Sequence, residues 1–166
     1  KLFFGALDGR LVALDPLTGK ELWSVKAERW QDGYSITGAP LYYDGMVITG
    51  FSGAEYGVRG KVKAFDARSG HLLWRFNTIP QDGEAGTETW ENESWRSHGG
   101  ANVWSTITAD LERGWVFLPV SAAGPDHYGG DRPGANLYAG SVVALDARTG
   151  QRIWHFQTVH HDLWDY

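Results

Sequence analysis

Three side chains in this sequence are of types that commonly do chemistry, and each lies in an unusual local context. Glu55 follows a Ser-Gly-Ala run, Trp104 follows Gly-Gly-Ala-Asn-Val, and Asp165 ends the run His-His-Asp-Leu-Trp-Asp. A glutamate offers the oxygen donors that hard divalent cations prefer. An indole offers a broad, rigid face for a flat ring, and an aspartate can accept a proton. Taken singly, each also has an ordinary explanation: a surface turn, a core tryptophan, and a turn or cap residue.

The composition narrows the kinds of site available. The chain has no cysteine, which excludes a thiolate metal site and a disulfide scaffold. His160 and His161 are neighbours, and adjacent side chains on a strand point to opposite faces, so we do not expect them to chelate one metal together. The formal net charge is -5 and no Lys/Arg cluster occurs, which argues against a nucleic-acid partner. No apolar run is long enough to span a membrane.

One segment recurs three times, at residues 13–23, 64–74 and 144–154. Each copy reads Ala-x-Asp-x-x-Thr/Ser-Gly-x-x-x-Trp and follows a strand-like run. The aspartate can accept hydrogen bonds from turn N–H groups, and the glycine supplies the positive φ that closes a hairpin. The next strand then carries a large aromatic side chain. Such repetition indicates one supersecondary unit stacked several times.

The turn signals and apolar runs predict an all-β chain without an amphipathic helix. We expect strands near residues 2–5, 11–15, 21–25, 36–43, 46–50, 61–66, 72–77, 103–109, 115–120, 141–146 and 152–157. The first interval between the repeat tryptophans fits one four-stranded propeller blade of about 40–50 residues. The second interval is longer and must contain insertions.

These expectations describe part of a single β-propeller domain, with about three four-stranded blades. We expect an incomplete blade at residues 1–26, which lacks its innermost strand, and complete blades at 34–78 and 99–158. Residues 160–166 would begin a further blade. Open blade faces would expose unpaired strand edges and tryptophans, so we expect the sequence to be an excerpt of a longer chain.

Two polar, Gly/Pro-rich segments hold the extra length. They are residues 78–100 and 122–140, and we expect both to be loops. Loops this long in a compact β fold are usually functional or disordered.

Three stretches resemble, in order, the active-site segments of alcohol and sugar dehydrogenases that depend on pyrroloquinoline quinone (PQQ). They are residues 37–40 leading to 52–60, residues 99–104, and residues 160–166. The resemblance covers essentially the whole chain. It implies an eight-bladed propeller with PQQ on its axis, and we expect no independent catalysis from the excerpt alone.

The resemblance implies a role for seven residues. Glu55 corresponds to a carboxylate ligand of a divalent metal, usually calcium, that lies against the quinone. Asp165 corresponds to the catalytic base and also belongs to the metal site, and Trp104 corresponds to the floor under the PQQ ring. Four more residues correspond to further cofactor contacts: Thr37, Ser52, Gly53 and Ala54.

One position departs from the pattern of the alcohol-oxidising members. They carry an asparagine metal ligand at the place that corresponds to Ala122, and residues 119–123 contain no asparagine. The segment that follows, with its Tyr-Gly-Gly run at residues 128–130, resembles instead the membrane-bound glucose and polyol branch, as does the double histidine. The second metal ligand is thus unassigned, and a lanthanide stays open as an alternative to calcium.

The leading hypothesis is an enzyme that oxidises a hydroxyl of a sugar, polyol or alcohol by hydride transfer to PQQ. Its electrons would pass to a respiratory quinone or cytochrome, and the resemblance implies a periplasmic location. Two alternatives stay open. One is a cofactor-free propeller scaffold for protein–protein interaction, of the type of the outer-membrane assembly lipoprotein, and the other is a degenerate, inactive family member. A scaffold would need the tryptophan repeats but not Glu55, Trp104 and Asp165 together.

Overall fold

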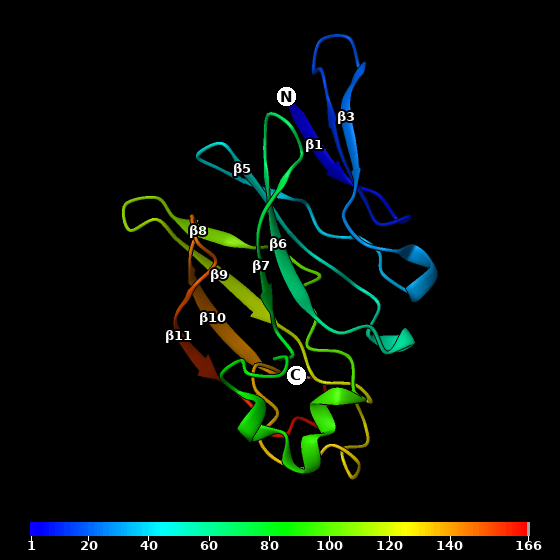
Figure 1. Ribbon diagram of the computed structural model, residues 1–166, viewed down its shortest axis with the longest axis vertical. Helices are drawn as coiled ribbons and strands as arrows, with labels where there is room; N and C mark the ends of the chain where they lie inside the picture. Colours follow the sequence, from blue (N-terminus) through cyan, green and yellow to red (C-terminus); the bar gives the residue numbers. More distant parts are fainter. Residues whose placement is uncertain (166) are drawn as a thin grey trace.

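The strands form three antiparallel sheets in the computed structural model, which describes residues 1–165 (Figure 1). The first sheet has the order β1-β2-β3, from β1 (Leu2–Gly5), β2 (Arg10–Leu14) and β3 (Glu21–Lys26). The second has the order β4-β5-β6-β7, from β4 (Leu41–Tyr43), β5 (Met46–Gly50), β6 (Lys61–Asp66) and β7 (Leu72–Asn77). The third has the order β8-β9-β10-β11, from β8 (Thr108–Asp110), β9 (Trp115–Val120), β10 (Ser141–Asp146) and β11 (Arg152–Gln157). Neighbours in sequence pair in each sheet, which confirms the predicted all-β fold built from hairpin units.

Two predicted strands are shorter than expected, and the reason bears on the site. The predictions at residues 36–43 and 103–109 were wrong in extent, because only β4 and β8 pair as strands there. The residues just before each strand leave their own sheet and pack backbone against backbone. A Cβ atom on Gly50 would lie only 1.9 Å from the Val103 carbonyl oxygen, and one on Gly38 only 2.9 Å from the Trp104 carbonyl oxygen. The third sheet's entry segment therefore lies directly on the second sheet.

The repeat tryptophans join each sheet to the next. The Trp23 indole N–H donates to the Ala67 carbonyl oxygen at 3.3 Å, and that of Trp74 donates to the Ala147 carbonyl oxygen at 2.9 Å. Each ring also lies against the glycine of the next repeat. A Cβ atom on Gly150 would come within 2.6 Å of the Trp74 ring, so no larger residue fits there without displacement.

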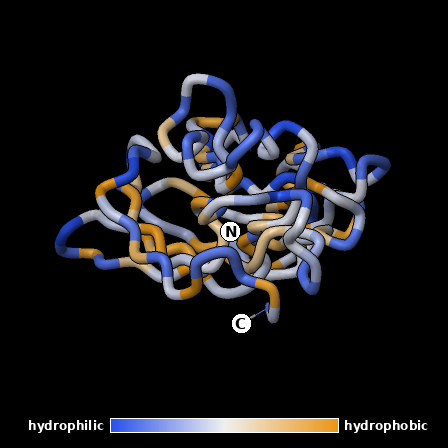
Figure 2. The backbone as a smooth tube through the Cα atoms, turned by 90° about the horizontal axis from the view of Figure 1, so that it is seen from below, coloured by the Kyte–Doolittle hydropathy of each residue, from blue (hydrophilic) through white to orange (hydrophobic). Residues whose placement is uncertain are grey.

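Each pair of neighbouring sheets encloses its own apolar core. A small cluster that includes Leu11, Val47 and Phe51 lies between the first and second sheets. A larger cluster that includes Ile48, Leu118 and further buried residues joins the second sheet to the third. In Figure 2 many hydrophobic stretches of the chain lie toward the middle of the molecule, and hydrophilic stretches are frequent in the outer loops. This is the arrangement that sheet-on-sheet packing requires.

The two long insertions are ordered and pack on each other at the end of the molecule drawn at the bottom of Figure 1. The first contains the 3-10 helices η3 (Thr87–Thr89) and η4 (Glu91–Arg96). Trp90 anchors it: the side chain is 2% exposed and its N–H donates to the Leu137 carbonyl oxygen at 2.5 Å. Of the two outcomes expected for loops of this length, disorder is therefore wrong.

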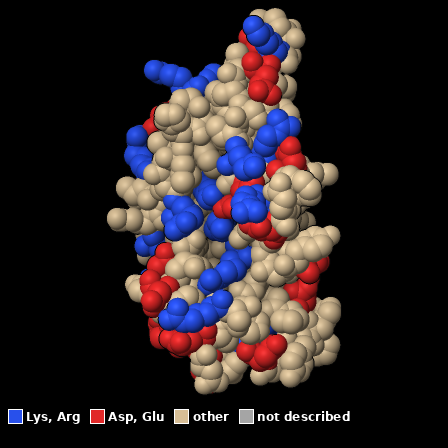
Figure 3. All heavy atoms as spheres, turned by 45° about the vertical axis from the view of Figure 1, so that its right-hand side comes forward, with Lys and Arg blue, Asp and Glu red and all other residues tan. Residues whose placement is uncertain are grey.

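The surface charges are mixed. Lys and Arg side chains interleave with Asp and Glu side chains on the face drawn in Figure 3. Among residues 1–165, no helix is long and apolar enough to cross a membrane.

Candidate active site

A cavity of about 360 Å³ collects all seven predicted site residues. These residues are Thr37, Ser52, Gly53, Ala54, Glu55, Trp104 and Asp165. Three residues that sequence reasoning missed complete the lining: Asn102, Ser121 and Asp126. The lining comes from the irregular connections that leave the strands, so the sheets act as the frame and the loops carry the polar groups.

A glycine-bounded turn presents Glu55. The short 3-10 helix η2 (Ala54–Tyr56) follows β5, with Gly53 at φ 125° before it and Gly57 at φ 71° after it. These are backbone conformations that side chains disfavour. A Cβ atom on Gly53 would also lie 2.3 Å from the Gly33 carbonyl oxygen. The Ser-Gly-Ala-Glu run therefore has a steric reason, and it leaves the Glu55 side chain exposed to the cavity.

Two hydroxyl groups tie the second sheet to the tryptophan segment. The Thr37 and Ser52 hydroxyls are hydrogen-bonded to each other, and the Thr37 hydroxyl also donates to the Trp104 carbonyl oxygen at 3.3 Å. Thr37 thus both borders the cavity and fixes the backbone of Trp104.

Trp104 differs from the tryptophans that join the sheets. It is 56% exposed, whereas Trp74 is 8% exposed. An indole left open on a cavity wall offers a flat apolar face to a ligand. This exposure removes the alternative that Trp104 is a core residue of the described sheets.

Asn102 offers unused hydrogen-bonding groups on the cavity wall. Its side chain is 1% exposed, and neither its amide oxygen nor its amide nitrogen has a hydrogen-bond partner within residues 1–165. Leaving buried polar groups unpaired costs about 1–3 kcal/mol for each group. The Ser121 hydroxyl accepts a hydrogen bond from the Asn102 backbone N–H at 3.1 Å, which holds the residue in place. Its position two residues before Trp104 was the available sequence signal.

Three carboxylates border the cavity: Glu55, Asp126 and Asp165. None of the three forms a hydrogen bond or ion pair through its carboxylate with another residue in the described part of the chain. Burial, and then the charge of Asp165, raise the pKa of Asp126 above its ordinary value; Glu55 adds to this effect, and His127 and Arg132 oppose it. The repulsion indicates that the carboxylates lie within electrostatic reach of one another.

A buried arginine joins the two backbone segments that lead to Asp126 and Asp165. Arg132 is 0% exposed, and its Nη2 donates to the carbonyl oxygens of Pro125 at 3.0 Å and Asp162 at 2.6 Å. Pro125 directly precedes Asp126, and Asp162 begins the turn that leads to Asp165. Arg132 therefore joins the 122–140 insertion to the C-terminal run. Sequence reasoning assigned Arg132 no role.

The residues present fit PQQ. A flat, polar cofactor matches an open indole face, a buried amide with unused donor and acceptor, and two hydroxyls on one wall. The described residues do not form a complete metal site, because no three His, Cys, Asp or Glu side chains among residues 1–165 lie close enough together to bind an ion by themselves. Glu55 and Asp165 would supply oxygen donors of the right chemistry for a hard divalent cation. Ala122, at the place of the asparagine ligand, is 1% exposed and lies outside the cavity lining.

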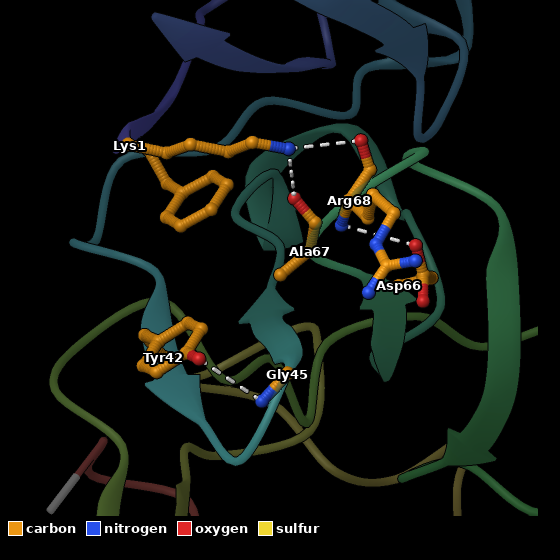
Figure 4. A pocket seen from close by; sticks show the side chains of 7 residues that line it. Lys1, Tyr42, Gly45, Asp66, Ala67 and Arg68 are labelled. Atoms are coloured by element: carbon orange, nitrogen blue, oxygen red, sulfur yellow. Dashed lines mark hydrogen bonds between the residues drawn. The ribbon is translucent and has the colours of Figure 1, made fainter. Parts of the chain in front are cut away.

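A larger cavity, of about 600 Å³, lies between the first and second sheets and has a structural character (Figure 4). Its polar groups are already in use. The Lys1 side-chain nitrogen donates to the carbonyl oxygens of Ala67 and Arg68, each at 2.9 Å, and Tyr42 accepts a hydrogen bond from the Gly45 N–H at 3.2 Å. These groups are therefore engaged in contacts within the fold, unlike the unpartnered polar groups of the smaller cavity.

Comparison with known proteins leads to the same family. Residues 27–166 match the family model described as PQQ: glucose/ethanol/alcohol dehydrogenase, β-propeller domain. The quinohemoprotein alcohol dehydrogenase ADH IIB of Pseudomonas putida is 40% identical over 100% of this chain and 26% of its own length. The dehydrogenase subunit of an alcohol dehydrogenase (quinone) of Gluconobacter oxydans is 41% identical over 100% of this chain and 25% of its own length.

A solved structure agrees in three dimensions. A europium-containing methanol dehydrogenase superposes with a TM-score of 0.91 at 33% sequence identity, over 99% of this chain and 31% of that chain. The chain thus spans about a quarter to a third of the relatives that it matches. It belongs to the PQQ-dependent glucose/ethanol/alcohol dehydrogenase family and contains part of that family's β-propeller domain.

Proposed function

We propose that the whole protein is a PQQ-dependent, metal-assisted dehydrogenase that oxidises a hydroxyl group of a sugar, polyol or alcohol. The observation that carries the proposal is the single cavity bordered by Glu55, Trp104 and Asp165, which come from three separate segments of a chain in this family. A purely architectural propeller has no need to bring these three side chains together.

Each residue has a definite task in this proposal. Trp104 supports the flat face of the cofactor, while Asn102, Thr37 and Ser52 offer hydrogen bonds around its edge. Glu55 supplies oxygen ligands to a calcium or lanthanide ion. When bound, PQQ accepts the hydride and the metal polarises the quinone carbonyl.

Asp165 takes the proton of the substrate hydroxyl in this proposal. Its carboxylate borders the cavity and has no hydrogen-bond partner among the described residues, so it is available as an acceptor. A positioned general base of this kind typically contributes ~10²–10⁴-fold to the rate.

The route of the electrons is proposed from the relatives. The Gluconobacter relative is an alcohol dehydrogenase (quinone), and the Pseudomonas relative is a quinohemoprotein. We extend this to a respiratory quinone or cytochrome as acceptor here, with the enzyme in the periplasm.

Reconstitution of the full-length protein tests the proposal. Purified apoprotein is titrated with PQQ and calcium, or with a lanthanide, and cofactor absorbance and reduction of an artificial dye are followed with D-glucose, glycerol and ethanol. We expect stoichiometric PQQ binding and substrate-dependent dye reduction. Absence of bound PQQ would favour the scaffold alternative, and bound PQQ without dye reduction would favour the inactive family member.

A further inference from the structure

Asp126 lies on the boundary between two cavities. It borders the 360 Å³ cavity together with Trp104 and Asp165, and it also borders an adjoining cavity of about 480 Å³. Three residues form the common boundary of the two cavities: Ala54, Glu55 and Asp126. A substrate whose reacting hydroxyl lies near Asp165 and whose remainder extends into the second cavity would therefore cross the boundary that Asp126 forms with Ala54 and Glu55.

The Asp126 carboxylate serves no evident structural purpose. It makes no hydrogen bond or ion pair with another described residue, and the like charges of Asp165 and Glu55 act against it. The backbone beside it is nevertheless fixed, because the preceding Pro125 carbonyl oxygen accepts from the buried Arg132 at 3.0 Å. A partly buried carboxylate without hydrogen-bond donors on a fixed backbone costs stability, so it points to an interaction made with a ligand.

A second observation in the same cavity also points to a ligand. Asn102 is 1% exposed, and both of its side-chain polar atoms lack a partner within the described residues. The cavity thus has unused hydrogen-bonding groups for a ligand at two places, the Asn102 amide and the Asp126 carboxylate.

The second cavity matches a hydroxylated molecule better than an alkyl chain. Its other polar groups include Ser97 and the pair of His98 and Asp131, whose Nε2 and Oδ1 atoms lie 3.3 Å apart. The apolar part of its described lining consists of small residues and one proline, without a bulky aliphatic or aromatic side chain. Carboxylates accept hydrogen bonds only, and hydroxyl groups are the donors that a neutral carbohydrate or polyol offers.

We propose that Asp126 is a specificity-determining residue that accepts hydrogen bonds from hydroxyl groups neighbouring the one that is oxidised. It thereby favours polyhydroxylated substrates over monohydric alcohols. The inference rests on the proposed function, because it places the reacting hydroxyl at Asp165. Ligation of the metal by Asp126 is a different role, and the measurement of bound metal in the test below separates the two.

The test compares Asp126→Asn and Asp126→Ala with the wild type in the full-length protein loaded with PQQ and calcium. Glycerol and 1-propanol have the same carbon skeleton, and D-glucose provides a larger polyhydroxylated substrate. We expect the ratio of kcat/KM for glycerol to that for 1-propanol to fall roughly tenfold or more, since a hydrogen bond to a charged group is lost. The corresponding ratio for D-glucose is expected to fall likewise, chiefly through KM.

A matched control removes the same charge elsewhere. Asp82 is on the other insertion with a side chain 82% exposed, and Asp82→Asn should leave both ratios at the wild-type value. Bound metal and bound PQQ are measured in every variant. An active wild type whose ratios do not change in the Asp126 variants overturns this inference alone. Loss of bound metal in those variants also overturns it, in favour of metal ligation. A wild type that binds no PQQ or oxidises none of the three substrates overturns the proposed function itself, and this inference with it.

Discussion

Carboxylates of the same chemical type occupy opposite settings at the two ends of the blades. In the repeats, Asp66 Oδ1 accepts hydrogen bonds from the Arg68 N–H at 3.0 Å and from the Ser69 N–H and hydroxyl, each at 2.7 Å. The equivalent aspartates of the other two repeats, Asp15 and Asp146, have the same pattern. At the cavity, the carboxylates of Asp126 and its neighbours have no such donors.

The pKa values change in opposite directions for this reason. Hydrogen bonds from Ser69 lower the pKa of Asp66, whereas burial and the charge of Asp165 raise that of Asp126. A carboxylate supplied with donors belongs to the architecture and stabilises its turn. A carboxylate that is held in place without hydrogen-bond donors is available to interact with a bound ligand. The difference between the two regions is thus one of satisfied and unsatisfied hydrogen-bonding capacity rather than residue type.

The largest effect should come from Asp165. In the reconstituted full-length enzyme, Asp165→Asn is expected to lower kcat by ~10²–10⁴-fold, because the amide cannot take the hydroxyl proton. PQQ content, measured by absorbance, and the thermal midpoint should stay near the wild-type values. Retained turnover would remove Asp165 from the role of base.

The next largest effect should be structural and lie at the repeat tryptophans. Trp74→Ala removes a ring that is 8% exposed and its hydrogen bond to Ala147, so we expect the free energy of unfolding to fall by about 3–5 kcal/mol. Urea denaturation of the full-length chain measures the change. Trp74→Phe is the control, because it keeps the ring against Gly150 and loses the N–H donor, which should cost about 1 kcal/mol. Equal losses in the two variants would contradict the packing role of the indole.

A pair of matched aspartates sharpens the comparison directly. Asp66→Ala should lower the thermal midpoint by roughly 2–4 °C, because the turn loses its three hydrogen bonds. Asp126→Ala should leave the midpoint unchanged or raise it slightly, because no donor is lost and a repulsion is relieved. Differential scanning calorimetry of the apoprotein compares the two. A drop of equal size in both would break the distinction between the two settings.

Glu28 offers the smallest and most specific test, through pH. Its carboxylate lies 3.0 Å from Lys61 Nζ and 2.6 Å from Lys63 Nζ and links the first sheet to β6. Burial opposes ionisation, but the hydrogen bonds from Lys63 and Lys61 outweigh it and lower the pKa of Glu28 below its ordinary 4.5. The stabilisation is therefore complete above pH 4.5 and is lost as the pH falls below that value. We expect Glu28→Gln to be less stable than the wild type at neutral pH, and the gap in unfolding free energy to narrow on acidification. A gap independent of pH would contradict the ion-pair assignment.

Local sequence information was sufficient for the hairpins. The repeat Ala-x-Asp-x-x-Thr/Ser-Gly-x-x-x-Trp contains its own turn acceptor, its positive-φ glycine and its docking aromatic, and most strand limits follow from it. The prediction of strands from local sequence failed at residues 36–40 and 103–107. The apolar pattern there resembles a strand, but glycines allow one backbone segment to lie on another. Contacts of that kind depend on a partner distant in the chain, so no local pattern reports them.

The site divides in the same way. The sequence by itself determined which residues were candidates, because runs such as Ser-Gly-Ala-Glu and His-His-Asp-Leu-Trp-Asp carry a recognisable resemblance. Only the tertiary structure decided that Asn102 has no partner, that Asp126 borders both cavities, and that Arg132 joins the segments leading to Asp126 and Asp165. The physical reason is that hydrogen-bond satisfaction and shared cavity walls are properties of side chains brought together by the sheets. Both properties depend on which segments of the chain meet in space and not on which residues are adjacent in the sequence.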